Sequence, residues 1–131
     1  MAPGSMDLSR QDWDALEDAL RRAASLLRKS RWTQDVLARD AAGAEVDPAD
    51  PQAKAFCAQG AFLRADPALD LRLVRAGMAL LHRAASDATD GAAIDLFSLN
   101  DDSETQKAAI LAVLERAAAL AVAQQENDTA G

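Results

Sequence analysis

The sequence predicts an all-α fold: an irregular bundle of about four main helices, with a loop or small hairpin near residues 31–50. Alanine makes up about a quarter of the chain and leucine is the next most common residue, and both lose little side-chain entropy in a helix. Tyrosine is absent and valine and isoleucine are few, so residues that favour strands are scarce. A chain of 131 residues fits one compact domain, whose core needs no disulfide or metal.

The first helix is expected from about Arg10 to Lys29. Ser9 is a good N-cap and Asp12 adds a negative charge in the first turn. Leu8 and Trp13 can form a hydrophobic staple across this helix start. One apolar face recurs at helical spacing, and we assign it to the core rather than to a ligand platform. It consists of Trp13, Leu16, Leu20, Ala23 and Leu27.

Turn-forming residues dominate the segment from 31 to 50. We expect a helical turn near Thr33–Leu37, followed by an extended or hairpin loop. Residues 36–39 and 44–46 can pair across the turn Asp40–Gly43, although an isolated hairpin is marginally stable unless it packs on something.

Two Asp-Pro pairs predict the next two helix starts, because an aspartate N-cap followed by proline is a favoured arrangement. Asp50 and Pro51 are expected to begin a helix that runs to about Arg64. Asp66-Pro67 is expected to begin another, which ends near Ala85. The core candidates on these helices are Phe56, Cys57, Gly60, Ala61, Leu63, Leu69, Leu73, Met78, Leu80 and Leu81.

After a break at Thr89–Gly91, residues 92–99 predict a short helix. The final helix is expected to be capped by Asp102 or by Ser103, which forms a capping box with Gln106. Its buried stripe comprises Ile110, Leu111, Leu114, Ala117, Ala118 and Ala121. We therefore expect one helical domain over residues 8–125, a disordered leader or expression remnant at 1–7, and a frayed tail at 126–131.

The net charge of −7 argues against general nucleic-acid binding, because phosphates repel an acidic surface. A single cysteine cannot form an internal disulfide, and no apolar run approaches the roughly 18 residues of a membrane span. We expect a cytoplasmic protein with no membrane contact. One cluster of positive side chains is either a solvated helix end that offsets the dipole or an anion-binding patch. It consists of Arg21, Arg22, Arg28, Lys29 and Arg31.

Several short motifs occur in a characteristic order along residues 15 to 123. They are Leu20-Arg-Arg-Ala-Ala-Ser-Leu-Leu27 leading to Trp32, Ala38-Arg-Asp-Ala-Ala-Gly43, Phe56-Cys-Ala-Gln-Gly-Ala61, Asn100-Asp101 and an alanine-rich final helix. In this order the chain resembles the bacterial and phage domain-of-unknown-function family 6197. It departs from the family before Asn100, where an aromatic residue is expected but Leu99 stands, with Phe97 two residues earlier.

The family offers no reaction or ligand to carry over. The resemblance implies only that five residues matter together, for folding or for a shared site. They are Trp32, Cys57, Gly60, Asn100 and Asp101.

The residues that carry chemistry are few. Cys57 is expected about six residues into its helix, beyond the strongest dipole field, and is read as a buried small hydrophobe rather than a nucleophile. The only histidine, His82, is read as a surface or hydrogen-bonded helix residue. Asp101, Asp102 and Glu104 are carboxylates of the kind that bind hard cations, but at a helix start they favour capping and loop locking. We expect no metal site and no cofactor.

Two functions remain open. The first is a non-enzymatic module that binds a protein partner or itself, favoured by apolar helix faces and little catalytic chemistry; an enzyme is the less favoured reading. The second is a small ligand-binding protein or enzyme, whose site would gather Trp32, Asp40, Cys57, Gly60, Asn100 and Asp101. A nucleic-acid-linked regulator that uses the basic cluster is a weaker third possibility.

Overall fold

The computed structural model describes residues 8–90, 95–102 and 104–130 of the chain. The described residues form five helices: α1 Arg10–Lys29, α2 Ala58–Ala65, α3 Leu71–Ala88, α4 Leu96–Asn100 and α5 Lys107–Ala130. Three two-residue strands lie between the first two helices: β1 Arg31–Trp32, β2 Ala38–Arg39 and β3 Ala55–Phe56. The fold is therefore a mostly helical bundle with one small sheet.

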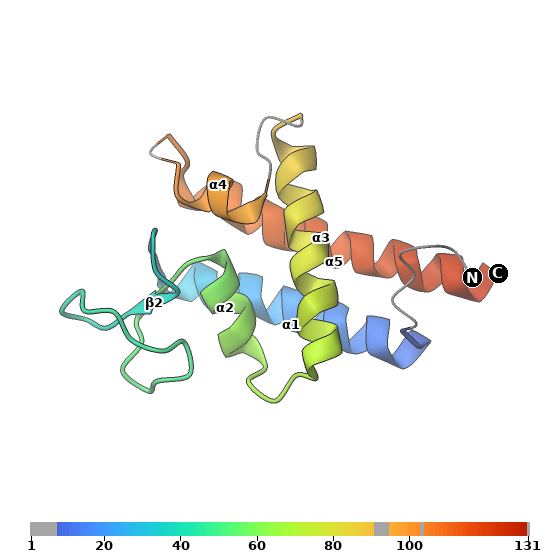
Figure 1. Ribbon diagram of the computed structural model, residues 1–131, viewed down its shortest axis with the longest axis horizontal. Coiled ribbons are helices and arrows are strands. Elements are labelled where there is room, and N and C mark those ends of the chain that lie inside the picture. Colours follow the sequence, from blue (N-terminus) through green and yellow to red (C-terminus); the bar gives the residue numbers. More distant parts are fainter. Residues whose placement is uncertain (1–7, 91–94, 103, 131) are drawn as a thin grey trace.

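Helices α1 and α5 form an antiparallel pair, and α3 crosses them steeply (Figure 1). Lys107 at the start of α5 donates from Nζ to the Ser30 carbonyl oxygen (2.6 Å) just beyond the end of α1. At the opposite end of the pair, Gln125 donates from Nε2 to the Arg10 carbonyl oxygen (3.5 Å). The sheet and α2 lie where α1 ends, and α4 lies beside the far end of α3 (Figure 1).

Helix α1 has the predicted bounds. Ser9 and Asp12 form a reciprocal capping box, in which each side chain accepts the other residue's backbone N–H at 3.0 Å. All five residues of its predicted face are buried, together with Leu8. The predicted stripe of α5 is buried as well, apart from the partly buried Leu111. On α3, Leu73, Leu80 and Leu81 are buried.

The predicted hairpin exists and gains support from a third strand. Residues 39 and 45 form an antiparallel bridge across the 40–43 turn, and the Val46 N–H donates to the Ala38 carbonyl oxygen (3.0 Å). The strand order is β1-β3-β2, with β1 parallel and β2 antiparallel to the central β3. The helical turn predicted near Thr33–Leu37 is wrong, since this stretch is a series of bends in which Asp35 has φ 71°.

The two Asp-Pro pairs that are predicted to start helices begin turns instead. Asp50 Oδ1 accepts the Gln52 N–H (2.8 Å), after which the chain enters β3, so α2 starts seven residues later than predicted, at Ala58. Asp66 Oδ1 accepts the Ala68 N–H (3.2 Å), and the N-cap of α3 is Asp70. Asx-turns use the same carboxylate-to-N–H bond as an N-cap, so the sequence signal is shared by the two structures.

Helix α3 ends at Ala88, just before the predicted break, and the short helix predicted near 92–99 corresponds to α4. Residues 91–94 lie outside the described residues. The predicted Asp102 cap of α5 is wrong, because Asp102 Oδ1 accepts the Glu104 N–H (2.8 Å) in a turn and the helix begins at Lys107. Ser103, the alternative cap, and the predicted leader at 1–7 also lie outside the described residues. Helix α5 continues to Ala130, into the segment where we expect fraying.

One stretch of α5, residues 107–126, is long and apolar enough to cross a membrane by length and composition. This corrects the expectation that no apolar stretch approaches that length. The core helix of a helical bundle can meet the same criteria, and α5 buries its apolar stripe against α1 and α3.

Candidate functional site

Asn100, the last residue of α4, joins three segments that are distant in sequence. Its Oδ1 accepts the indole N–H of Trp32 (3.0 Å) and the backbone N–H of Ala58 (3.1 Å), the first residue of α2. Its Nδ2 donates to the Thr33 carbonyl oxygen (3.3 Å). The side chain is 3% exposed, so a fully satisfied amide ties β1 and α2 to α4 inside the protein. We call this arrangement the Asn100 clamp.

The neighbouring residues extend the clamp to the loop after β1. Asp101 Oδ1 accepts the Asp35 N–H (2.9 Å) and the Asn100 Nδ2 amide (3.0 Å). Gln34 donates from Nε2 to the carbonyl oxygens of Asn100 (3.0 Å) and Asp102 (2.9 Å). These bonds hold Asp35 in the left-handed region (φ 71°), which costs a non-glycine residue energy and persists only when its surroundings fix it.

Cys57 is the N-cap of α2, so its predicted place inside a helix is wrong. Its Sγ accepts the Gly60 N–H at 3.2 Å. Burial of the side chain raises the pKa of the thiol, the N–H groups of Gly60 and Gln59 oppose the shift, and the charge of Asp101 adds to it. The thiol is therefore held protonated, and the reading of Cys57 as a buried structural residue fits this environment.

Gly60 marks a close approach between backbones, as its place in the sequence suggests. A Cβ atom built on Gly60 would lie 1.9 Å from the Leu37 carbonyl oxygen. The same carbonyl accepts the Cys57 N–H (3.1 Å), so the loop sits directly on the first turn of α2. Only glycine allows this contact.

Beside the clamp lies a half-open cleft of about 250 Å³. Its walls come from the 35–37 loop, the hairpin, the first turn of α2 and α4. The lining residues are Asp35, Val36, Leu37, Glu45, Cys57, Gln59, Leu96, Phe97, Asn100 and Asp101. Phe97 is 44% exposed, which is unusual for a large apolar side chain among the described residues of this chain.

The structure brings together some of the predicted site residues and leaves others apart. Cys57, Asn100 and Asp101 line the cleft, and Trp32 and Gly60 support its walls through the bonds and contacts above. Asp40 does not join them, since its Oδ1 accepts the N–H groups of Ala42 and Ala44 (2.9 Å each) in the hairpin turn.

Sequence reasoning missed most of the cleft's apolar and acidic lining. No sequence pattern marked the other lining residues as members of a site, because pairing between distant segments brings them together. They are Asp35, Val36, Leu37, Glu45, Gln59 and Leu96. Phe97 had a signal, because it is the aromatic residue two positions before Leu99, where the family resemblance leads us to expect one.

His82 supports α4 from α3. Its Nδ1 accepts the Leu96 N–H (2.9 Å), and its ring meets Phe97 edge to face, with centroids 5.3 Å apart. The imidazole is thus a hydrogen-bonded helix residue, and the acceptor nitrogen is occupied by a backbone donor.

The carboxylates near α4 act on the backbone. Asp101 locks the 35–37 loop and Asp102 closes a turn, in line with the loop-locking interpretation. Within residues 8–90, 95–102 and 104–130, no group of three or more histidine, cysteine or acidic side chains is arranged to hold a metal ion.

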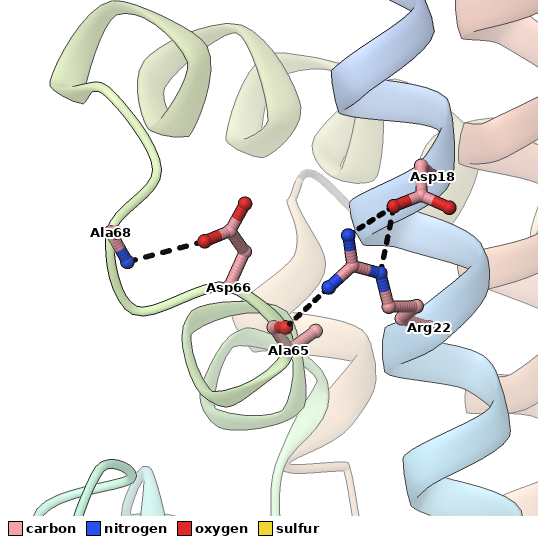
Figure 2. Close-up of polar contacts among 5 residues, drawn as sticks. All are labelled: Asp18, Arg22, Ala65, Asp66 and Ala68. Carbon is pink, nitrogen blue, oxygen red and sulfur yellow. Dashed lines mark hydrogen bonds and ion pairs between the residues drawn. The ribbon is translucent and has the colours of Figure 1, made fainter.

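The basic cluster at the end of α1 is largely paired. Arg21 Nε lies 2.7 Å from a carboxylate oxygen of Glu17, and Arg28 pairs with Glu115. Figure 2 shows the Arg22 guanidinium between Asp18 and the Ala65 carbonyl oxygen, to which Nη1 donates at 3.5 Å. Lys29 and Arg31 follow as exposed residues. The pairing leaves less positive charge for an anion than the sequence suggests.

The chain matches the model of one protein family, described as "Family of unknown function (DUF6197)", over residues 12–120. No curated protein and no solved structure matches the chain. The family match covers the clamp, the cleft and nearly all of the helical core, in agreement with the motif order noted in the sequence. The chain therefore belongs to this family of unknown function.

Proposed function

We propose that this protein is a non-enzymatic interaction module that docks an exposed segment of a protein partner in the cleft beside the Asn100 clamp. The observation that carries the proposal is a cleft lined by both apolar and polar side chains and built on a hydrogen-bonded support. Apolar concavities with a few convergent polar groups are the usual form of binding sites.

The size of the cleft favours a peptide side chain over a whole small molecule. Pockets for drug-sized ligands span roughly 300–1,000 Å³. A cleft of about 250 Å³ that is open on one side accommodates one or two side chains of a longer segment. The partly exposed ring of Phe97 provides the kind of aromatic contact that dominates binding energy at interfaces.

The chemistry of the lining favours binding over catalysis. Its only strong nucleophile, Cys57, has a raised thiol pKa because it is buried. The lining contains no histidine or lysine to activate the thiol, and the Nδ1 atom of His82 already accepts the Leu96 N–H. A thiol nucleophile is activated by an adjacent base or by a lowered pKa, whereas the charge of the nearby Asp101 carboxylate adds to the raised pKa of Cys57.

A separate protein partner is favoured over self-association through a broad apolar face. The large exposed hydrophobic side chains of the described residues are Leu71 (62% exposed) and Phe97 (44%). Leu71 opens α3, whereas Phe97 packs on His82, about three helical turns further along α3. They therefore do not form the contiguous patch that marks a homodimer interface.

The proposal is tested by panning a random peptide library on the wild-type protein and on Gln59→Trp, which fills the cleft from α2. Gln11→Trp, the same change at an exposed position of α1, is the matched control. We expect peptides that bind wild type and Gln11→Trp but lose at least about tenfold in affinity for Gln59→Trp. Peptides that bind all three proteins equally, or a library that gives none, would contradict the docking cleft. Thermal melts of the variants verify that they fold.

A further inference from the structure

We propose that the residue docked in this cleft is an arginine of the partner segment. The inference rests on the proposed function and names the chemistry of its ligand. It follows from the carboxylates of the lining, its apolar side chains and the fixed position of Asp101.

The lining of the cleft carries negative charge and no positive side chain, and we call its exposed carboxylates the rim. Three of its lining residues are carboxylates, Asp35, Glu45 and Asp101, and the lining includes no lysine or arginine. None of the three forms an ion pair in the described part of the chain. Like charges gathered around a partly enclosed surface concentrate the field there and attract a cation. The net charge of −7 adds to the attraction at longer range.

The apolar part of the lining favours a cation with an apolar stem. Val36 and Leu37 line it with partly exposed aliphatic side chains, the buried Leu96 lies beside them, and Phe97 adds an exposed aromatic ring. Long cationic side chains lay their methylene groups on apolar surface while the charged head stays polar. A simple inorganic cation would gain nothing from these apolar side chains.

Two properties distinguish arginine from lysine in this setting. The guanidinium presents five N–H donors in a plane, so it can bond to more than one carboxylate at once, whereas an ammonium is a compact, strongly hydrated charge. The guanidinium is also more weakly hydrated and stacks on aromatic rings such as Phe97.

The site is arranged before the ligand arrives. Asp101 is fixed by the Asp35 N–H and by Asn100, and Asp35 is itself held at φ 71° by that bond. A preorganised site loses little conformational entropy on binding, so a single side chain can be recognised with useful affinity.

Three pentapeptides of sequence Ala-Leu-Xaa-Leu-Ala, acetylated and amidated, test the inference by calorimetric titration. Xaa is arginine, lysine or citrulline, the neutral analogue that keeps the shape of arginine. We expect the arginine peptide to bind at least about tenfold more tightly than the citrulline peptide, as a charge-assisted bond would require, and more tightly than the lysine peptide. Equal binding of the arginine and citrulline peptides would overturn the inference.

Two double variants distinguish the effect of the cleft's carboxylates on peptide binding from the effect of the protein's net charge. Asp35→Asn with Glu45→Gln removes two rim charges, and asparagine tolerates the left-handed conformation of Asp35. Asp14→Asn with Glu126→Gln removes the same charges from exposed positions outside the cleft. We expect at least about a tenfold loss for the arginine peptide with the first pair and less than about twofold with the second.

Equal losses with both pairs would show that only the net charge attracts the peptide and would overturn the arginine site. The two proposals fail differently. Panned peptides without arginine that still depend on Gln59 would leave the docking cleft in place and remove the arginine. The absence of any peptide that depends on Gln59 would remove the docking cleft itself.

Discussion

Asn100 contributes most to the site at the scale of single residues. Its amide supplies both an acceptor and a donor, and both are used inside the protein. An aspartate could accept the two N–H groups but could not donate to Thr33, and a leucine could do neither. The Asn100-Asp101 pair of the sequence therefore combines two roles, in which the amide joins elements and the carboxylate fixes the loop.

Replacing Asn100 by alanine tests the clamp. We expect Asn100→Ala to lower the free energy of unfolding by about 2–4 kcal/mol, because the buried Ala58 N–H and the partly buried Trp32 indole N–H lose their acceptor. Urea denaturation measures the loss. Gln11→Ala, which truncates an exposed amide residue on α1, is the control and should change stability by less than about 0.5 kcal/mol. A variant as stable as the control would show that the clamp contributes nothing to stability.

Cys57 offers a second test at this scale. Its thiol is buried, caps α2 and has a raised pKa caused mainly by that burial. We expect iodoacetamide at pH 8 to modify the folded protein at least about tenfold more slowly than the urea-unfolded protein, because modification requires local opening. Mass spectrometry follows the reaction. Equal rates in the two states would mean that the thiol is exposed or activated, and would revive the enzyme hypothesis.

At the scale of elements, local sequence decided the long amphipathic helices but not the short segments between them. The capping box and apolar spacing of residues 9–29 agree with each other, and α1 has the predicted bounds. Asp50 and Asp66 carry the same signal as an N-cap but form Asx-turns, because β3 and the loop before α3 need those residues outside a helix. At Asp50 the pairing of β3 decides between a helix and a turn, and this pairing joins residues far apart in the sequence.

The contact between α2 and the 35–37 loop leads to a prediction at Gly60. We expect Gly60→Ala to cost at least about 2 kcal/mol, since the new Cβ would overlap the Leu37 carbonyl oxygen, which belongs to the backbone and cannot rotate away. Gly43→Ala is the control, because Gly43 has φ +89° but nothing within 4 Å, so only conformational strain of about 1 kcal/mol is expected. Thermal melts compare the two. A smaller cost at Gly60 than at Gly43 would contradict the close approach.

The start of α1 gives a pH-dependent prediction. The Ser9 N–H holds the pKa of the Asp12 carboxyl below its usual value of 3.8. A lowered pKa in the folded state adds stability above the unfolded pKa and loses it as the pH falls through the folded pKa. We expect Asp12→Asn to melt below wild type at pH 6, with the difference shrinking below about pH 4.

Asp14→Asn, at an exposed position on the same helix, is the control for the acid melt. If the Asp12 carboxylate supports the cap, Asp14→Asn should lower the melting temperature at pH 6 by less than Asp12→Asn does. A gap between wild type and Asp12→Asn that stays constant from pH 6 to pH 2 would mean that the carboxylate charge does not support the cap.

At the scale of the whole molecule, the antiparallel α1–α5 pair with α3 across it forms a scaffold, and the site lies at one end of that scaffold (Figure 1). Three stretches meet there: residues 31–37, 57–60 and 96–101. The helical class and most of the core followed from composition and periodicity. Three predicted site residues, Cys57, Asn100 and Asp101, line one cleft.

The remainder of the site could not be predicted from the sequence. Glu45 faces the cleft because the hairpin folds over residues 40–43 and is anchored by β3, and Val36 does so because Asp101 fixes the loop. These are contacts between residues far apart in the chain, which hydrophobic periodicity does not encode. Asp40 also stood among the candidates, but the hairpin turn itself uses its carboxylate.

The most direct test of the central claim is to map the peptide-binding surface by NMR. The arginine pentapeptide would be titrated into the ¹⁵N-labelled wild-type protein while the backbone amide shifts are followed. We predict that the largest changes fall within residues 35–37, 57–60 and 96–101, which surround the cleft. Changes centred instead on the acidic surface of α1 near residues 14–18, or none at all, would contradict a docking site beside the Asn100 clamp.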